Sequence, residues 1–285
     1  MELILRPGVI EDARECGRIC YEAFKSIADQ HNFPPQMPSL EIATALITMR
    51  LSHSDFYSVV AELDGQIVGS IFLDERSIIA GASLLSVDPL VMNGTIGRQL
   101  MQAIIKRADQ PRFPGLRGVV IAWHYRALAL YAKLGFNSPE TFSAMQGKPL
   151  ALSISGYDIR PARNMDLPTC NQLCYRVHGH DRAGELVDAI RQETANVVER
   201  QGRITGYSTG IGWSSHAVAE STDDLKALIG AAPEFTGVGF LVPSRNGELI
   251  RWCLDQRLRF VCQANLITRG LYNDPAGAYL PSITY

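Results

Sequence analysis

Apolar residues keep helical spacing in the segment 98–108, where they occupy positions 100, 101, 104, 105 and 108. The apolar runs 82–87 and 118–123 each have the length of a buried strand. The second run leads into a helical pattern over 124–136, with Gly135 in the position that favours a left-handed helix end. The pattern therefore predicts a strand, a loop and a helix twice in succession.

An internal repeat organises the whole chain. Apolar residues alternate around Asp64-Gly65 and again around Gln201-Gly202, the pattern of a tight β-hairpin. Six earlier residues recur at one offset of 154 (160 minus 6), and residues around the hairpins recur at 137 (199 minus 62). The first set is Arg6, Pro7, Asp12, Cys16, Cys20 and Tyr21, matched by Arg160, Pro161, Asp166, Cys170, Cys174 and Tyr175; the second set includes Glu62 and Glu199. We infer that the chain is duplicated.

The duplication predicts an α/β protein with two domains, residues 1–150 and 151–285. Each copy begins with a short strand and a turn whose Asp can cap the following helix. The first copy carries 17 extra residues (154 minus 137) before its hairpin. They include the proline-rich loop 29–38, which either shapes a substrate entrance or is a stiff surface connector.

Composition and charge narrow the classes of partner. A net charge of −2, with both signs interspersed, gives no basic surface for nucleic acid or an anionic membrane. No window reaches the ~18 apolar residues of a membrane span and no signal peptide precedes the first strand, so we expect a cytoplasmic protein. Six cysteines without a signal peptide indicate reduced thiols. Cys16/Cys20 and Cys170/Cys174 each share one helix face and predict core packing, and no metal is expected.

The loop before the helix 98–108 has the composition of a phosphate site. Gly94 and Gly97 precede the expected helix, and Arg98 is its first residue. A helix N-terminus presents unpaired N–H groups and the positive end of the helix dipole, and glycines let a pyrophosphate approach the backbone. Many strand-to-helix turns with two glycines bind nothing, so the loop alone leaves both interpretations open.

Taken together, the two strand–helix units resemble the GNAT superfamily of N-acetyltransferases. That family's acetyl-CoA signature is Val-x-Pro followed by Gln/Arg-x-x-Gly-x-Gly/Ala, matched here by Val87, Pro89 and Gly97. Its later helix, Asn-x-x-Ala-x-x-Leu-Tyr-x-Lys-x-Gly-Phe, is matched by Ala127, Leu130, Tyr131, Lys133, Gly135 and Phe136. The chain departs from the family with Met92 for Gln or Arg, Thr95 for the first glycine and His124 for the asparagine.

The resemblance implies two GNAT-like domains of α/β (α+β) class, each with a mixed, mostly antiparallel central sheet flanked by helices. It implies transfer of an acyl group, acetyl first, from CoA to an amine of a small molecule or a protein. The CoA site would comprise Val87, Met92, Asn93, Gly94, Thr95, Ile96, Gly97, Arg98 and His124. Tyr131 resembles the family's general acid, and its ordinary pKa of ~10 keeps it protonated at neutral pH. The general base is left open among Glu75, Asp88, His124 and a chain of waters.

The second copy lacks the residues that the resemblance assigns to cofactor binding and catalysis. A helix is expected to begin there with Thr222 as its cap, and Asp223 and Asp224 in its first turn would repel a pyrophosphate. No tyrosine is in register with Tyr131 when Asn246 is aligned with His124. We therefore expect one CoA site, in the first copy, with the second copy bracing the first or closing its acceptor pocket. The competing hypothesis is a non-catalytic acyl-CoA-binding or protein-interaction module, and a homodimer is compatible with either.

Overall fold

The computed structural model describes residues 2–92 and 94–284. The strands are β1 (Leu3–Pro7), β2 (Phe56–Leu63), β3 (Gln66–Asp74), β4 (Ile79–Val87), β5 (Gly115–Ile121), β6 (Thr141–Gln146), β7 (Asp158–Pro161), β8 (Asn196–Arg200), β9 (Arg203–Ser208), β10 (Ala217–Ala219), β11 (Phe240–Pro243), β12 (Arg259–Gly270) and β13 (Ala278–Leu280). The helices are α1 (Ala13–Gln30), α2 (Leu40–Ser52), α3 (Ile96–Ala108), α4 (Tyr125–Lys133), α5 (Leu167–His178), α6 (Ala183–Arg191), α7 (Thr222–Ala231) and α8 (Gly247–Asp255), with 3-10 turns η1 (Ile10–Asp12) and η2 (Asn164–Asp166). The two predicted strand–helix units are β4–α3 and β5–α4.

The strands form two sheets. One has the order β1-β2-β3-β4-β5-β12-β6-β11 and the other β13-β10-β9-β8-β7. Neighbouring strands are antiparallel except β4 and β5, which are parallel. In the larger sheet, helices cover both faces of its first strands: Val60 of β2 packs with α1 and α2, whereas its neighbours Val59 and Ala61 pack with α3 and α4.

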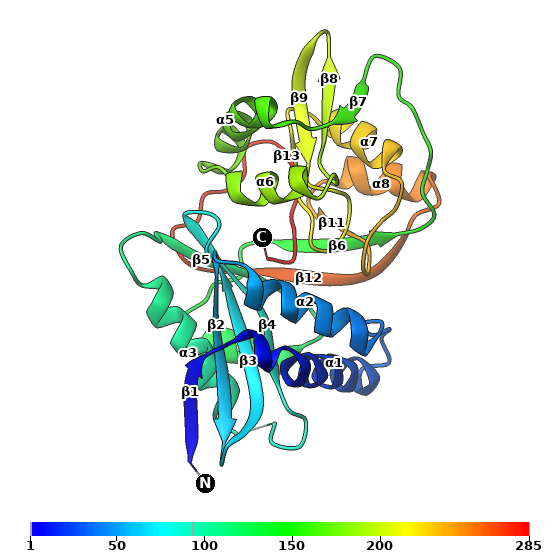
Figure 1. Cartoon of the computed structure of the whole chain (residues 1–285). Coiled ribbons are helices and arrows are strands. Elements are labelled where there is room, and N and C mark those ends of the chain that lie inside the picture. The colour runs from blue at the N-terminus through cyan, green and yellow to red at the C-terminus, as the bar shows by residue number, and fades with distance from the viewer. Residues whose placement is uncertain (1, 93, 285) are drawn as a thin grey trace.

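Strand β12 joins the two halves of the chain. It lies between β5 and β6, paired antiparallel to both, so that a strand from residues 259–270 completes a sheet begun by residues 3–7. Figure 1 shows β6 and β12 side by side across the middle of the molecule, between the blue-to-cyan first half and the yellow-green second half. The domain boundary near residue 150 stays a prediction, and the larger sheet crosses it.

The repeated residues make the same contacts in both halves. Arg6 donates to Asp12 at 2.7 Å and to Glu62 at 2.7 Å, and Arg160 donates to Asp166 at 2.7 Å and to Glu199 at 2.6 Å. The matching offsets in the sequence therefore reflect one ion cluster, built twice, that fixes the first strand and helix to the hairpin.

The two predicted hairpin turns also share one geometry. Asp64 and Gly65 have φ of 51° and 81°, and Gln201 and Gly202 have φ of 52° and 75°. Two successive positive φ values are typical of the type I′ turn, whose twist matches that of the flanking strands. The predicted hairpins, β2–β3 and β8–β9, are confirmed.

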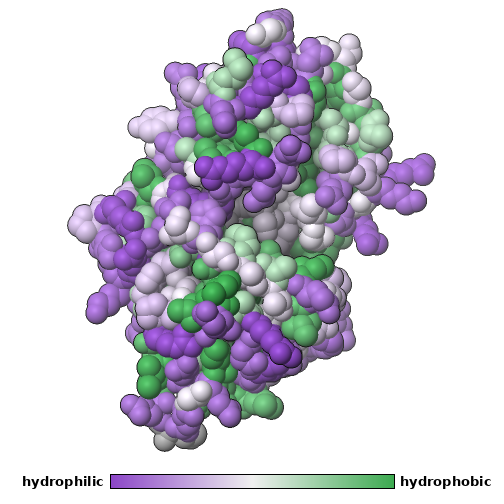
Figure 2. Space-filling view, in the orientation of Figure 1, coloured by the Kyte–Doolittle hydropathy of each residue, from purple (hydrophilic) through white to green (hydrophobic). Residues whose placement is uncertain are grey.

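The paired cysteines lie in the core, as predicted. Cys16, Cys20, Cys170 and Cys174 are fully buried. On the face shown in Figure 2, hydrophilic side chains predominate and hydrophobic ones form small scattered groups. Within residues 2–92 and 94–284, no helix combines the length and the apolar character that crossing a membrane requires.

Candidate active site

Strands β4 and β5 separate along their length and open a cavity. They pair only from Ile79–Gly115 to Gly81–Arg117, and beyond that point the backbones diverge. A cavity of about 740 Å³ lies in this fork, lined on one side by Ser83, Leu84 and Leu85 of β4 and on the other by residues 118–121 of β5. The parallel pair therefore places a deep, mostly apolar space in the sheet itself.

The N-terminus of α3 opens into the same cavity. The first hydrogen bond of this helix runs from the Gln99 N–H to the Thr95 carbonyl at 3.0 Å, so the preceding N–H groups have no partner within the helix. Gly97, the second residue, leaves room for a ligand: a Cβ built on it would meet only Val87, at 3.6 Å. Free donors, the helix dipole and open space are what a phosphate requires.

The structure brings together most of the predicted cofactor residues. The cavity lining includes Val87, Met92, Gly94, Ile96, Gly97, Arg98 and His124, together with Tyr131. Thr95 is the N-cap residue of α3, with φ of −92°, a conformation open to any L-residue, and its hydroxyl accepts from Gln99 at 2.9 Å. Asn93 lies outside the described residues. The threonine at this position therefore imposes no backbone strain.

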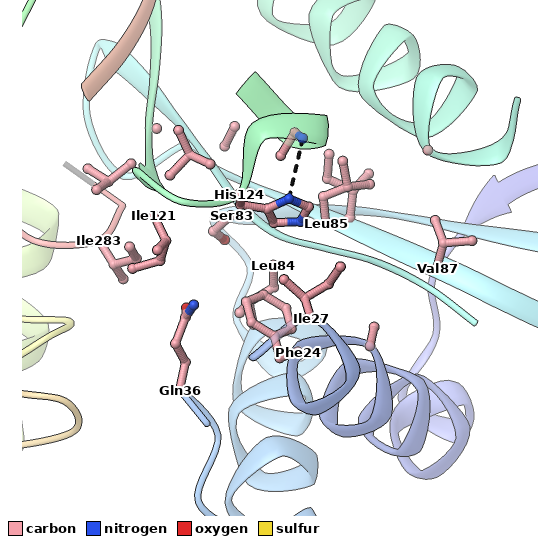
Figure 3. Close-up of a pocket in the computed structure, with 18 of the residues that line it drawn as sticks. Phe24, Ile27, Gln36, Ser83, Leu84, Leu85, Val87, Ile121, His124 and Ile283 are labelled. Carbon is pink, nitrogen blue, oxygen red and sulfur yellow. Dashed lines mark hydrogen bonds between the residues drawn. The ribbon is translucent and has the colours of Figure 1, made fainter. Parts of the chain in front are cut away.

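Tyr131 and His124 are held by α4. Burial raises the pKa of Tyr131 to about 12, so its phenol stays protonated across the physiological range. His124 is the N-cap of α4, and its Nδ1 accepts from the Ala127 N–H at 3.4 Å (Figure 3). Burial, and then the nearby charges of Arg126 and His31, lower the pKa of His124 to about 4. Because Nδ1 is an acceptor in a neutral ring, Nε2 carries the proton and is a donor.

The other two base candidates do not line this cavity. Glu75 is held by Arg107 at 2.7 Å and also by Arg112, and although burial opposes it, these hydrogen bonds lower its pKa. Asp88 accepts from the Leu90 N–H at 2.9 Å and from Arg18 at 3.0 Å. Among the described residues that line the cavity, three are arginines, Arg50, Arg98 and Arg126, and none is an aspartate or glutamate. The cavity is therefore electropositive.

A β-bulge lies at the fork, and the sequence pattern does not predict it. The register of β3 and β4 shifts between Ser70–Ser86 and Phe72–Ser83, so Leu84 and Leu85 together oppose Ile71. Leu84 has φ of 49°, rare for a residue with a branched side chain. A bulge releases backbone groups from the ladder, here where β4 lines the cavity. No sequence signal marks it, because Leu84 and Leu85 look like ordinary strand residues.

The proline-rich loop and the second half of the chain complete the cavity walls. Gln36, Met37 and Pro38 line it, and Figure 3 shows Gln36 extending from the loop toward the space between Ile283 and Leu84. Phe33 of the same loop stacks on Trp123 with ring centroids 4.9 Å apart. The second half supplies Trp213, Ser214, Thr236, Gly237 and Ile283. The entrance interpretation of the loop is thus favoured over that of a connector.

Helix α7, which corresponds in the second half to α3 in the first, carries two aspartates in its first turn. The N-cap of α7 is Ser221 and not Thr222, a correction to the sequence analysis, since Ser221 Oγ accepts from the Asp224 N–H at 3.3 Å. Asp224 is fully buried and accepts from the Thr205 and Ser221 hydroxyls at 2.5 and 2.6 Å. Asn246 has the same capping role and backbone angles as His124, and Cys253 stands in register with Tyr131. The first turn of α7 therefore already carries a buried carboxylate, whereas no acidic residue lies in the first turn of α3.

The part of the chain that the structure describes holds no group of three or more His, Cys, Asp or Glu side chains that could bind a metal ion.

Residues 53–138 match the acetyltransferase (GNAT) domain family. No curated protein matches the chain significantly in sequence.

Solved structures with the same fold cover both halves of the chain. A protein of Pyrococcus horikoshii assigned as an acetyltransferase has a TM-score of 0.77 at 15% identity, over 97% of this chain and 92% of its own. A GCN5-related N-acetyltransferase from Sphaerobacter thermophilus has 0.63 at 15%, over 95% and 96%. A tandem GNAT protein from the clavulanic acid biosynthesis pathway has 0.55 at 14%, over 94% and 98%.

Residues 53–138 therefore match a GNAT acetyltransferase domain, and the chain as a whole shares its fold with a tandem GNAT protein. The predicted fold class, α/β with two GNAT-like units, is confirmed.

Proposed function

We propose that the protein transfers an acetyl group from acetyl-CoA to an amine, with one active site in the cavity between β4 and β5. The observation that carries the proposal is the convergence, in one cavity, of the N–H groups in the first turn of α3, which have no partner within the helix, the protonated Tyr131 and the fork of the sheet. The N-terminus of α3, with Arg98, would hold the pyrophosphate. Acetyl-CoA supplies an activated thioester.

The residues around the fork have distinct parts in the transfer. The amine nitrogen attacks the thioester carbonyl carbon, an N–C bond forms and the C–S bond breaks. A backbone N–H released by the bulge at Leu84–Leu85 would hold the carbonyl oxygen as it gains charge. The leaving thiolate takes the proton of Tyr131, and the proton lost from the amine returns through water to restore the phenol.

His124 binds and orients in this scheme. Its Nε2–H is a donor to the cofactor, because Nδ1 is engaged by the N–H of Ala127. A low pKa makes the ring a poor base near neutral pH. The amine accordingly reacts in its uncharged form, and CoA release should rise with pH as the amine loses its proton.

The test is a CoA-release assay with acetyl-CoA and a panel of amines, preceded by calorimetry with acetyl-CoA alone. Binding of one equivalent with release of CoA supports the proposal. Binding without release for any amine favours the non-catalytic alternative. Absence of binding at millimolar acetyl-CoA would refute both.

A further inference from the structure

One wall of the cavity carries an arginine that the proposed acyl transfer does not use. Ile42, Leu46 and Arg50 recur every four residues along α2 and all line the cavity. Arg50 is only 3% exposed although it carries a charge. An arginine on an apolar stripe is costly to bury unless something compensates its charge.

The protein itself compensates Arg50 only in part: its guanidinium carbon lies 5.6 Å from the centre of the Phe56 ring, within the range of a cation–π contact. Its NH1 donates to the Leu46 carbonyl at 3.2 Å, and its Nε has no hydrogen-bond partner among the residues that the structure describes. Asp74, whose charge favours the charged form of Arg50, is already held in a fork by Arg76, at 2.9 and 2.6 Å. Burial and the neighbouring Arg76 both disfavour the charge of Arg50, yet its pKa, lowered to about 10, leaves it charged at neutral pH.

A second polar group in the cavity is also unsatisfied. Ser83, on β4 beside the bulge, is 9% exposed and its hydroxyl has no hydrogen-bond partner within the described chain. Figure 3 shows Ser83 between Ile121 and Leu84 in the cavity wall. Buried polar groups in native proteins are nearly always paired, so two unpaired donors lining one apolar cavity point to a ligand.

The two ends of the cavity lie on opposite faces of the sheet. The N-terminus of α3 belongs to the face packed by α3 and α4, and Arg50 belongs to the face packed by α1 and α2. The fork between β4 and β5 connects them. If the cofactor enters from the α3 face, as proposed above, its thioester lies in the fork and the acceptor occupies the α2 face.

We propose that this face binds an acceptor amine that carries a carboxylate and an apolar body, such as an apolar amino acid, with Arg50 and Ser83 donating to the carboxylate. Guanidinium and hydroxyl donors both suit a carboxylate, and the apolar walls formed by Phe24, Ile27, Ile42 and Leu46 suit the body. This inference rests on the proposed function and names its substrate class.

The first experiment compares acids with amides in the wild-type protein, and needs no turnover. 3-Phenylpropionate should raise the melting temperature and 3-phenylpropionamide should not, in the presence or absence of acetyl-CoA. Equal shifts for both compounds would overturn the carboxylate site even if acyl transfer is demonstrated. A shift for the acid alone would support it even if no amine in the panel is acetylated.

The second experiment uses variants in the CoA-release assay. We expect Arg50→Met to lower kcat/KM for L-phenylalanine by about ten- to a hundredfold, the value of a charge-assisted contact, and to change that for phenethylamine by less than about twofold. Rates are compared on the uncharged fraction of each amine. Arg50→Lys should recover part of the loss, and Arg191→Met is the matched control, since its side chain is 75% exposed.

Stability and donor specificity separate the remaining explanations. Arg50→Met should fold with an unchanged or higher melting temperature, because an apolar side chain replaces a poorly compensated charge. Equal losses for both amines together with a lower melting temperature would make Arg50 structural and refute the proposal.

If Arg50→Met favours acetyl-CoA over succinyl-CoA without changing the choice of amine, the carboxylate belongs to the acyl donor, and the acceptor assignment is wrong. Should this variant not fold, Ser83→Ala and the wild-type comparison still test the site.

Discussion

An aspartate at Gly97 should make the protein more stable and at the same time unable to bind acetyl-CoA. Gly97 is the second residue of α3, so an aspartate there gains about 0.1–0.3 kcal/mol of helix propensity over glycine. A negative charge in the first turn adds about 0.3–1 kcal/mol by its interaction with the helix dipole. The melting temperature of the free protein should rise by about 1–2 °C.

The same carboxylate would stand where the pyrophosphate is proposed to bind. Two unit charges 4 Å apart repel by about 4 kcal/mol at the effective dielectric constant near a protein surface, and screening by salt reduces this to about 2. The dissociation constant for acetyl-CoA should therefore rise by about thirtyfold or more. Isothermal titration calorimetry measures this change, and a melting curve without ligand measures the stability.

Two further substitutions separate charge from size. Gly97→Asn has the shape of the aspartate without its charge, and Gly97→Ala adds only a Cβ, 3.6 Å from Val87. Both should bind acetyl-CoA more tightly than Gly97→Asp does. If the aspartate and asparagine variants bind equally well, no phosphate lies at this helix end, and the reasoning from α3 fails.

Other predictions test the proposed general acid, the repeated ion cluster and one buried histidine. Tyr131→Phe should lower kcat for CoA release by about a hundredfold or more without weakening acetyl-CoA binding, and the wild-type pH profile should show no alkaline fall up to about pH 10, since the pKa of Tyr131 is about 12. Asp12 and Asp166 do not cap α1 and α5 with their side chains, contrary to the sequence analysis; each carboxylate accepts instead from the N–H that opens the preceding 3-10 turn. Asp12→Ala and Asp166→Ala should each cost about 1–2 kcal/mol of unfolding free energy in urea titrations, because each removes this bond and the partner of an arginine; a large difference between them would contradict equivalent clusters. Burial lowers the pKa of His216 to about 4 from an unfolded value of ~6.5, so its contribution is present above about pH 6.5 and is lost as the pH falls through 4. Melting temperatures should drop across that range, and His216→Gln should flatten the drop; an unchanged slope would show that other groups cause it.

The sequence carried enough information for the elements, the repeat and most of the residues that line the α3 end of the cavity. Those features depend on local patterns: apolar spacing in α3, the I′ turn pairs and glycines next to a helix start. Arg6, Asp12 and Glu62 could be matched to their counterparts, although the ion cluster that they form becomes visible only in three dimensions.

The proposed acceptor end could not be predicted in the same way. Its walls come from α1, α2, β4 and the segments around Trp213 and Ile283, which are distant in the sequence. Arg50 reads as an ordinary charged residue near a helix end, and only its burial without a carboxylate partner distinguishes it. The bulge at Leu84 likewise depends on the register of β4 with β3, which the order of side chains does not encode.

The position of β12 affects how the chain folds while it is being synthesised. Until residues 259–270 leave the ribosome, β5 and β6 have no strand between them, and each presents open N–H and C=O groups. At about 5–20 residues per second, the wait after β6 lasts on the order of ten seconds. During that time the facing edges of β5 and β6 are both exposed, and a chaperone or a neighbouring nascent chain could pair with either. A fragment ending near residue 150 would remain in that state permanently, so the first half should be soluble only when the rest of the chain is attached.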